Sequence, residues 1–239
     1  MTSFFYFFES LFERPHRAIC LCLVRCWSFP GCLAWLQYRR RIRLPDYCEG
    51  RPEEAIVHYE QAVKLRPDYG DAYYNFGSVL FQQGRIDDAI AQWQKALAIQ
   101  PNDAAAHTSL GNAFLQKGWP EQAIVHYQRA VEIDPSEVSA RNNMAWVLAT
   151  SSDPSIRNGA MALNLARQAV EISGGKDAIF FRTLAASYGE CGKFADAIAA
   201  AEKGEMIAIS RGDSQLARTF EKDIALYRAD IPLHQAALH

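Results

Sequence analysis

Apolar and small residues recur with helical spacing between residues 70 and 135, and the pattern occurs there twice. The first copy consists of Tyr73, Phe76, Gly77, Leu80, Gly84, Ala89, Trp93, Ala96 and Pro101. The second copy consists of His107, Leu110, Gly111, Phe114, Gly118, Ala123, Tyr127, Ala130 and Pro135. Each matched pair lies 34 residues apart, with no slip. A fixed period of this length predicts a solenoid of stacked helix pairs.

This pattern resembles the tetratricopeptide repeat (TPR), a helix–turn–helix unit that stacks on copies of itself. Large residues alternate with Gly and Ala where two antiparallel helices must approach closely, and a proline follows the second helix. The resemblance implies an all-α fold, a right-handed α-α superhelix with a C-terminal capping helix. It also implies that the first helices line a concave face that holds peptides.

The pattern continues on both sides of the two clear copies. We expect a partial unit at 46–69 and full units at 70–103, 104–137, 138–175 and 176–209. The fourth unit has an expanded turn from Thr150 to Gly159, and the second helix of the fifth extends towards Ile209. Residues 210–239 hold an amphipathic helix from Ser214 to Arg228 and a tail. A solenoid needs a terminal element with a polar outer face, which predicts that this helix is the cap.

Residues 1–45 are a leader of different composition. They contain no lysine and show no repeat pattern, and five of the six cysteines of the chain lie before residue 50 (Cys20, Cys22, Cys26, Cys32 and Cys48). The apolar runs are divided by Arg25 and by Pro30-Gly31, so neither a secretory signal nor a membrane-spanning helix fits well. The basic cluster at 39–43 nevertheless resembles a cytoplasmic flank. Two interpretations stay open, a membrane-associated segment and a mistranslated start.

Composition excludes several classes of function. The chain is 49% hydrophobic and 22% charged with a net charge of −2, which allows a sizeable core and argues against nucleic-acid binding. The cysteines lack the paired spacing of zinc sites. Cys191 has no histidine near it in the chain, His107 takes a packing position, and no phosphate-binding loop is present. We therefore predict no catalysis, no cofactor and no metal.

A peptide-binding groove is the remaining candidate site. Its side chains should lie one turn from the packing positions of the first helices. These positions are Tyr74, Asn75, Ser78, Gln82, Thr108, Asn112, Gln116, Asn142, Asn143, Trp146 and Arg182, with Ser109 among them. This lining is rich in amides, which both donate and accept hydrogen bonds, and it is nearly uncharged, with Arg182 as its only basic residue. It predicts an extended peptide held through its backbone, with Tyr74 and Trp146 as apolar anchors.

The sequence thus predicts a protein–protein interaction scaffold without catalysis. The alternative is a non-catalytic module of a membrane-linked glycosyltransferase system, since residues 142–159 resemble the end of the repeat arrays of O-linked N-acetylglucosamine transferases. Expected partners are a protein or peptide, no nucleic acid, and a membrane only through residues 1–45. If the leader is an artefact, the open N-terminal edge should self-associate. A cytoplasmic location is favoured, and membrane association is the alternative.

Overall fold

The computed structural model describes residues 52–234, and within them every regular element is a helix. The helices are α3 (Pro52–Leu65), α4 (Gly70–Gln82), α5 (Ile86–Ile99), α6 (Ala104–Gln116), α7 (Pro120–Ile133), α8 (Val138–Thr150), α9 (Gly159–Ile172), α10 (Ala178–Glu190), α11 (Phe194–Ser210) and α12 (Ser214–Arg228). They belong to one compact unit that begins at Pro52. The predicted all-α class is confirmed.

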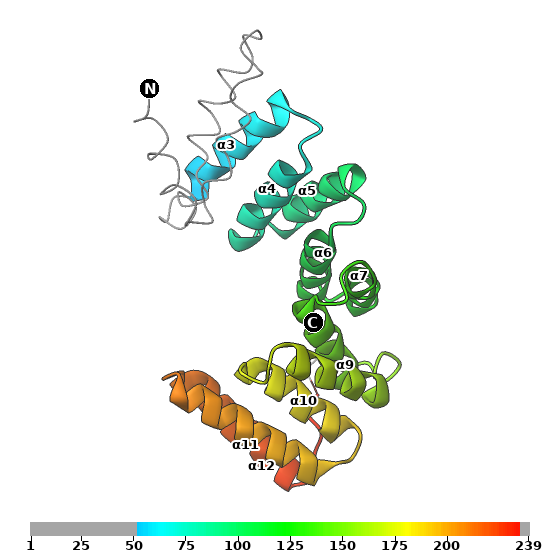
Figure 1. The fold of residues 1–239 in the computed structure, drawn as a ribbon, viewed down its shortest axis with the longest axis vertical. Coiled ribbons are helices and arrows are strands. Elements are labelled where there is room, and N and C mark those ends of the chain that lie inside the picture. The colour runs from blue at the N-terminus through cyan, green and yellow to red at the C-terminus, as the bar shows by residue number, and fades with distance from the viewer. Residues whose placement is uncertain (1–51, 235–239) are drawn as a thin grey trace, which may run out of the picture. The chain divides into compact units, whose positions relative to one another are not determined.

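The helices pack as antiparallel pairs in chain order, from α3 to α12 (Figure 1). The most extensive contacts join α4 to α5, α6 to α7, α8 to α9 and α10 to α11. The first helices of successive pairs also touch, α4 with α6, α6 with α8 and α8 with α10. The described second helices α5, α7, α9 and α11 make no comparable contact with one another. The first helices therefore form the inner layer of the predicted superhelix.

Two glycines show why each pair fits together. A Cβ atom on Gly77 would lie 2.7 Å from Nε1 of Trp93, and one on Gly111 would lie 2.4 Å from Cε1 of Tyr127. Both aromatic side chains are buried, Tyr127 completely. Only a residue without a side chain allows the rings this close to the first helix, as the alternation of large and small residues predicts.

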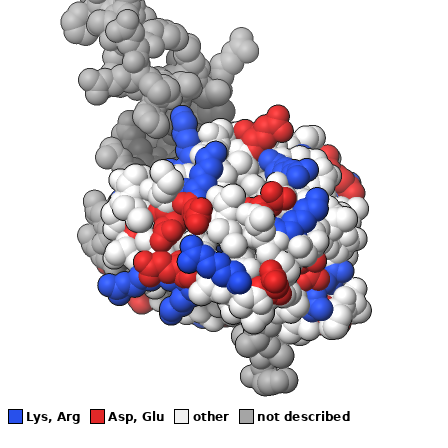
Figure 2. Space-filling model, turned by 90° about the horizontal axis from the view of Figure 1, so that it is seen from below, with Lys and Arg blue, Asp and Glu red and all other residues white. Residues whose placement is uncertain are grey.

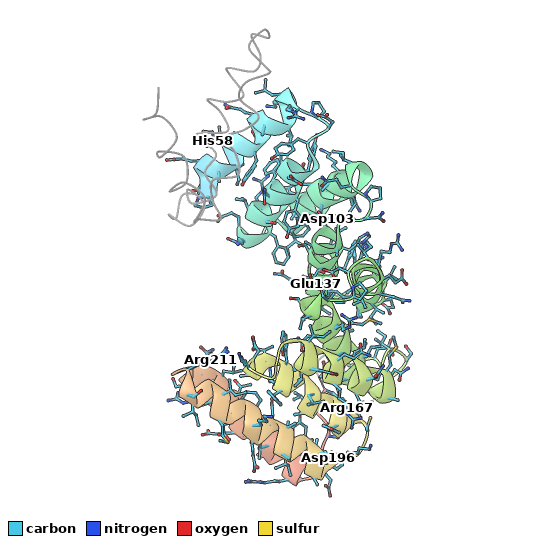
Figure 3. The ribbon with its side chains drawn as sticks, in the orientation of Figure 1. His58, Asp103, Glu137, Arg167, Asp196 and Arg211 are labelled. Carbon is cyan, nitrogen blue, oxygen red and sulfur yellow. The ribbon has the colours of Figure 1, made fainter. Side chains whose placement is uncertain are left out.

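Acidic side chains cap the beginnings of three inner helices, α6, α8 and α10. The Oδ1 atom of Asp103 accepts a hydrogen bond from the Ala106 amide at 3.1 Å, and Oε1 of Glu137 accepts one from the Ser139 amide at 3.1 Å. Both residues are labelled where α6 and α8 begin (Figure 3). Asp177 caps α10 in the same way. These caps satisfy amide groups that a helix leaves unpaired and place an anion at its positive end.

The last helix, α12, covers the apolar side of α11 as the sequence predicts. Phe220 and Tyr227 are fully buried, and Ile224 is 5% exposed. A Cβ atom on Gly204 of α11 would lie 2.4 Å from Cζ of Phe220, so the phenyl ring sits directly on this glycine. On the face seen from this end, acidic and basic side chains are interspersed (Figure 2). The α12 helix therefore ends the stack with a polar outer surface.

The expanded turn between α8 and α9 is held by one arginine. Arg157 donates from Nη1 to the Ser151 carbonyl at 2.8 Å and from Nε to Oε1 of Glu190 at 3.0 Å. His234 also contacts this carboxylate, with its Nε2 atom 2.7 Å from Oε2 of Glu190. The long turn and the C-terminal segment are thus both tied to the end of α10.

The leader with its four cysteines, and the beginning of the partial unit with Cys48, lie outside the described residues. The predictions of membrane association and of self-association at the N-terminal edge involve this region and stay predictions. Within residues 52–234, no helix is long and apolar enough to cross a membrane.

Candidate functional site

A row of mostly polar side chains crosses the inner helices α4, α6, α8 and α10 and reaches the terminal helix α12. We call it the strip, and its residues are Ser78 and Gln82 on α4, Ser109 and Asn112 on α6, Asn143 and Trp146 on α8, Arg182 on α10, and Asp223 on α12. A shared hollow, a hydrogen bond, a ring contact and an ion pair link each helix to the next. The strip is therefore continuous along the inner layer.

The hollow lies where α4 meets α6. It has a volume of about 120 Å³ and is lined by Ser78, Phe81, Gln82, Trp93, Ser109 and Asn112. Ser78 donates its hydroxyl hydrogen to the Tyr74 carbonyl at 3.0 Å, and Nε1 of Trp93 donates to the same carbonyl at 3.0 Å. The side chains of Gln82 and Ser109 make no hydrogen bond to the described part of the chain. These two polar groups can therefore bond a ligand without breaking an internal contact.

An amide network joins α6 to α8. The Oδ1 atom of Asn112 accepts from the Tyr127 hydroxyl at 2.7 Å and from Nδ2 of Asn143 at 2.9 Å. Asn143 in turn accepts from Nδ2 of Asn142 at 3.3 Å. Burial raises the pKa of the Tyr127 phenol well above its usual range, so it stays a hydrogen-bond donor. Because these contacts use only the oxygen of Asn112, its Nδ2 atom keeps two hydrogens for a ligand.

An aromatic ring and two charges form the other end of the strip. The Arg182 guanidinium lies 4.8 Å from the centre of the Trp146 ring, and its Nε donates to Oδ2 of Asp223 at 2.7 Å. The side chain of Asp223 is 5% exposed and that of Arg182 is 28% exposed. The cation is therefore held from two sides, by a ring and by a buried carboxylate.

The eleven predicted groove residues divide into three groups. Six lie on the strip: Ser78, Gln82, Asn112, Asn143, Trp146 and Arg182. Tyr74 and Asn75 are half-buried on α4, and Gln116 is exposed at the end of α6. Thr108 and Asn142 are buried, with 8% and 5% of their surface exposed. These two offer little surface to a partner, because their side chains bond within the chain. Thr108 donates to the Ala104 carbonyl at 2.9 Å, and Asn142 donates to Asn143.

Sequence reasoning missed Asp223 and the use of the Tyr127 hydroxyl. Asp223 falls in the amphipathic pattern of α12 beside the exposed Lys222, so its position resembles part of the solvated face. The repeat pattern places Tyr127 at a packing position, but the bond of its hydroxyl to Asn112 depends on side-chain geometry. Sequence reasoning identified Arg182 as the only basic residue of the groove but gave it no acidic partner, and the structure shows that Asp223 pairs with it.

A histidine pair connects α6 and α7 away from the strip. The Nδ1 atoms of His107 and His126 are 3.0 Å apart, and the His126 ring stacks on Phe114 at 5.2 Å between ring centres. Burial lowers the pKa of both imidazoles. A neighbouring positive charge lowers each pKa further, that of Arg129 for His107 and that of His107 for His126. His107 therefore packs as expected, with a polar contact that the sequence did not indicate.

No three His, Cys, Asp or Glu side chains in 52–234 are arranged to hold a metal ion. Burial raises the pKa of the Cys191 thiol, which makes it a poorer nucleophile. The features that remain on the strip are hydrogen-bonding groups and one aromatic surface.

Comparison with known families locates the repeats. A family described as "TPR repeat" matches residues 46–84 and 77–118, and one described as "Tetratricopeptide repeat" matches residues 104–137. No curated protein matches the sequence.

Three solved structures with the same architecture are each less than 25% identical in sequence to this chain. A crystal structure of MamA superposes with a TM-score of 0.61 at 18% identity, covering 70% of this chain and 95% of that one. For YrrB, described as a TPR protein with an unusual peptide-binding site, the TM-score is 0.58 at 23% identity, with 74% and 86% covered. For TTC0263, a thermophilic TPR protein of Thermus thermophilus, the TM-score is 0.59 at 20% identity, with 78% and 97% covered. These similarities show the fold.

Proposed function

The chain is a tetratricopeptide-repeat protein, a class of protein-interaction scaffold, and on this premise we propose that its strip binds an extended segment of a partner protein. The observation that carries this proposal is the continuity of the strip across α4, α6, α8, α10 and α12. Polar side chains that follow one another along an inner face can bond successive peptide units of an extended chain.

The chemistry of the strip suits a peptide backbone. Gln82 and Asn112 each offer an amide with unused hydrogen-bonding groups, and a backbone presents both a donor and an acceptor at each residue. Trp146 is half-buried and adds an apolar surface at the other end. The relative YrrB is described as having an unusual peptide-binding site, which supports peptide binding by this fold.

The strip also sets the length of the segment. Five helices at interaxial distances of about 10 Å span about 40 Å, and an extended chain of about twelve residues covers that distance. A library of random twelve-residue peptides displayed on phage is therefore a suitable probe. Selection against the full chain should enrich peptides that bind along the strip.

The test removes two polar groups of the strip, Gln82 and Ser109, and one beside it on α4, Asn75, without disturbing the core. Asn75→Ala, Gln82→Ala and Ser109→Ala together leave the bond from Tyr127 to Asn112 in place. Loss of about 1 kcal/mol for each hydrogen bond should weaken the selected peptides by about tenfold or more. Gln61→Ala, Gln94→Ala and Gln122→Ala, three exposed positions on second helices, are the matched control and should leave affinity unchanged. Equal affinity for both triple variants would show that the strip is not the binding site.

A further inference from the structure

The strip carries no net charge. Only two of its eight residues are charged, Arg182 and Asp223, and they form an ion pair at 2.7 Å. The other six are Ser78, Gln82, Ser109, Asn112, Asn143 and Trp146. A partner that lies on the strip therefore meets no unpaired charge among the strip residues.

The carboxylate of Asp223 takes the place that an acidic ligand would use. A guanidinium is well suited to bind a carboxylate, and Arg182 is held in position by the Trp146 ring. Asp223 is almost fully buried, so separating it from Arg182 would leave an unpaired charge in the interior. A second carboxylate that approached Arg182 would meet the negative charge of Asp223, and like charges brought together at an interface oppose binding.

We propose that Asp223 determines the specificity of the strip: by pairing with Arg182 it excludes acidic segments and selects an uncharged partner segment rich in hydroxyl or amide side chains. This proposal rests on the proposed function and names the chemical class of its partner. Asp223 acts through Arg182 and does not itself contact the partner.

The variant that tests the proposal is Asp223→Asn, which keeps the size of the side chain and an oxygen that can accept from Nε of Arg182. The matched control is Glu202→Gln, which removes one negative charge from a carboxylate paired with Arg228 of α12, at 3.7 Å and outside the strip. Circular dichroism of both variants checks that they are folded.

The first measurement needs no peptide. Sodium acetate is added to the full chain, and the Nε–H signal of Arg182 is followed by nuclear magnetic resonance, with Arg182→Lys to assign it. The signal should shift with acetate in Asp223→Asn and stay in place in the wild type and in Glu202→Gln. Equal shifts in all three proteins overturn the role of Asp223.

The second measurement repeats the phage selection with each protein. The wild type and Glu202→Gln should enrich uncharged peptides, whereas Asp223→Asn should enrich peptides with Asp or Glu and bind them about tenfold more tightly than the wild type does. Acidic peptides enriched by the wild type overturn the proposal, even where the strip is shown to bind them. Peptides that bind the triple variant of Asn75, Gln82 and Ser109 as tightly as they bind the wild type overturn the proposed function instead. The proposed class of partner is then overturned as well.

Discussion

At the residue scale, the pair of His107 and His126 places two titratable rings in contact at packing positions of the fold. The Nδ1 atoms of His107 and His126 are 3.0 Å apart, so one ring can donate its N–H to the other, whereas protonating both rings would place two positive charges and two donors face to face. For His107, burial has the largest effect and lowers the pKa, a hydrogen bond to the Pro101 backbone and the charge of Asp103 raise it, and the charge of Arg129 lowers it. Burial lowers the pKa of both rings in the folded chain, mainly by desolvation.

We predict that the folded chain loses stability as pH falls below about 6.5. The pKa of each imidazole is lower in the folded state than in the unfolded state, so the unfolded chain takes up more protons in this range. Above that pH the imidazoles are neutral in both states, so the two states bind the same number of protons and stability no longer depends on pH through these rings. Urea unfolding followed by circular dichroism at pH 7.5 and 5.5 measures the effect.

The control for this prediction is His126→Asn, in which a neutral amide faces His107. The variant should lose less stability between the two pH values than the wild type, because only one imidazole remains. An identical loss in both proteins would assign the pH dependence to other groups.

At the element scale, Arg157 connects the expanded turn to the end of α10. It bonds the Ser151 carbonyl and the Glu190 carboxylate, and its side chain and that of Glu190 are each 17% exposed. Two backbone bonds also fold the turn, from the Ile156 amide to the Asp153 carbonyl and from the Asn158 amide to the Leu148 carbonyl. A partly buried ion pair therefore connects this turn to α10.

We predict that Arg157→Ala lowers the free energy of unfolding by about 1–3 kcal/mol, because the Glu190 carboxylate then loses a charged partner. Hydrogen exchange should become faster at the amides of Ile156 and Asn158. Arg129→Ala breaks an exposed pair with Glu132 and should change stability little. Unchanged exchange in the turn would show that its backbone bonds hold it without the arginine.

At the scale of the whole described unit, stability passes from each helix pair to the next. A stack of repeats is held by contacts between neighbours, so damage at one end should weaken the near repeats more than the far ones. Phe220 of α12 is fully buried against Gly204 of α11 and marks the C-terminal end of this stack.

We predict that Phe220→Ala destabilises the C-terminal end by about 3–5 kcal/mol, the cost of a large cavity in a packed core. Hydrogen exchange should rise in α10 and α11 and change less in α4 and α5. Arg218→Ala, at an exposed position of α12, is the control. An even rise along all described helices would mean that the stack unfolds as a single cooperative block.

That the first helices form the inner layer was implied by the resemblance to the tetratricopeptide repeat, whereas the sequence by itself determined the helix pairs and their order. Every feature on which that prediction depended is local: the 34-residue period, glycine opposite a large ring, and turn residues between helices. In a repeat stack each unit contacts only its neighbours, so local patterns nearly suffice to specify the fold.

Only the tertiary structure decided which groove residues are available to a partner. The bonds from Asn143 to Asn112 and from Arg182 to Asp223 join residues 31 and 41 positions apart. Helical spacing places a side chain on a face, but the rotamer and the neighbouring helix decide whether it bonds within the chain or remains open. For that reason the sequence predicted an amide-rich inner face, while the burial of Thr108 and Asn142 and the neutralisation of Arg182 emerged only from the packing of one helix on the next.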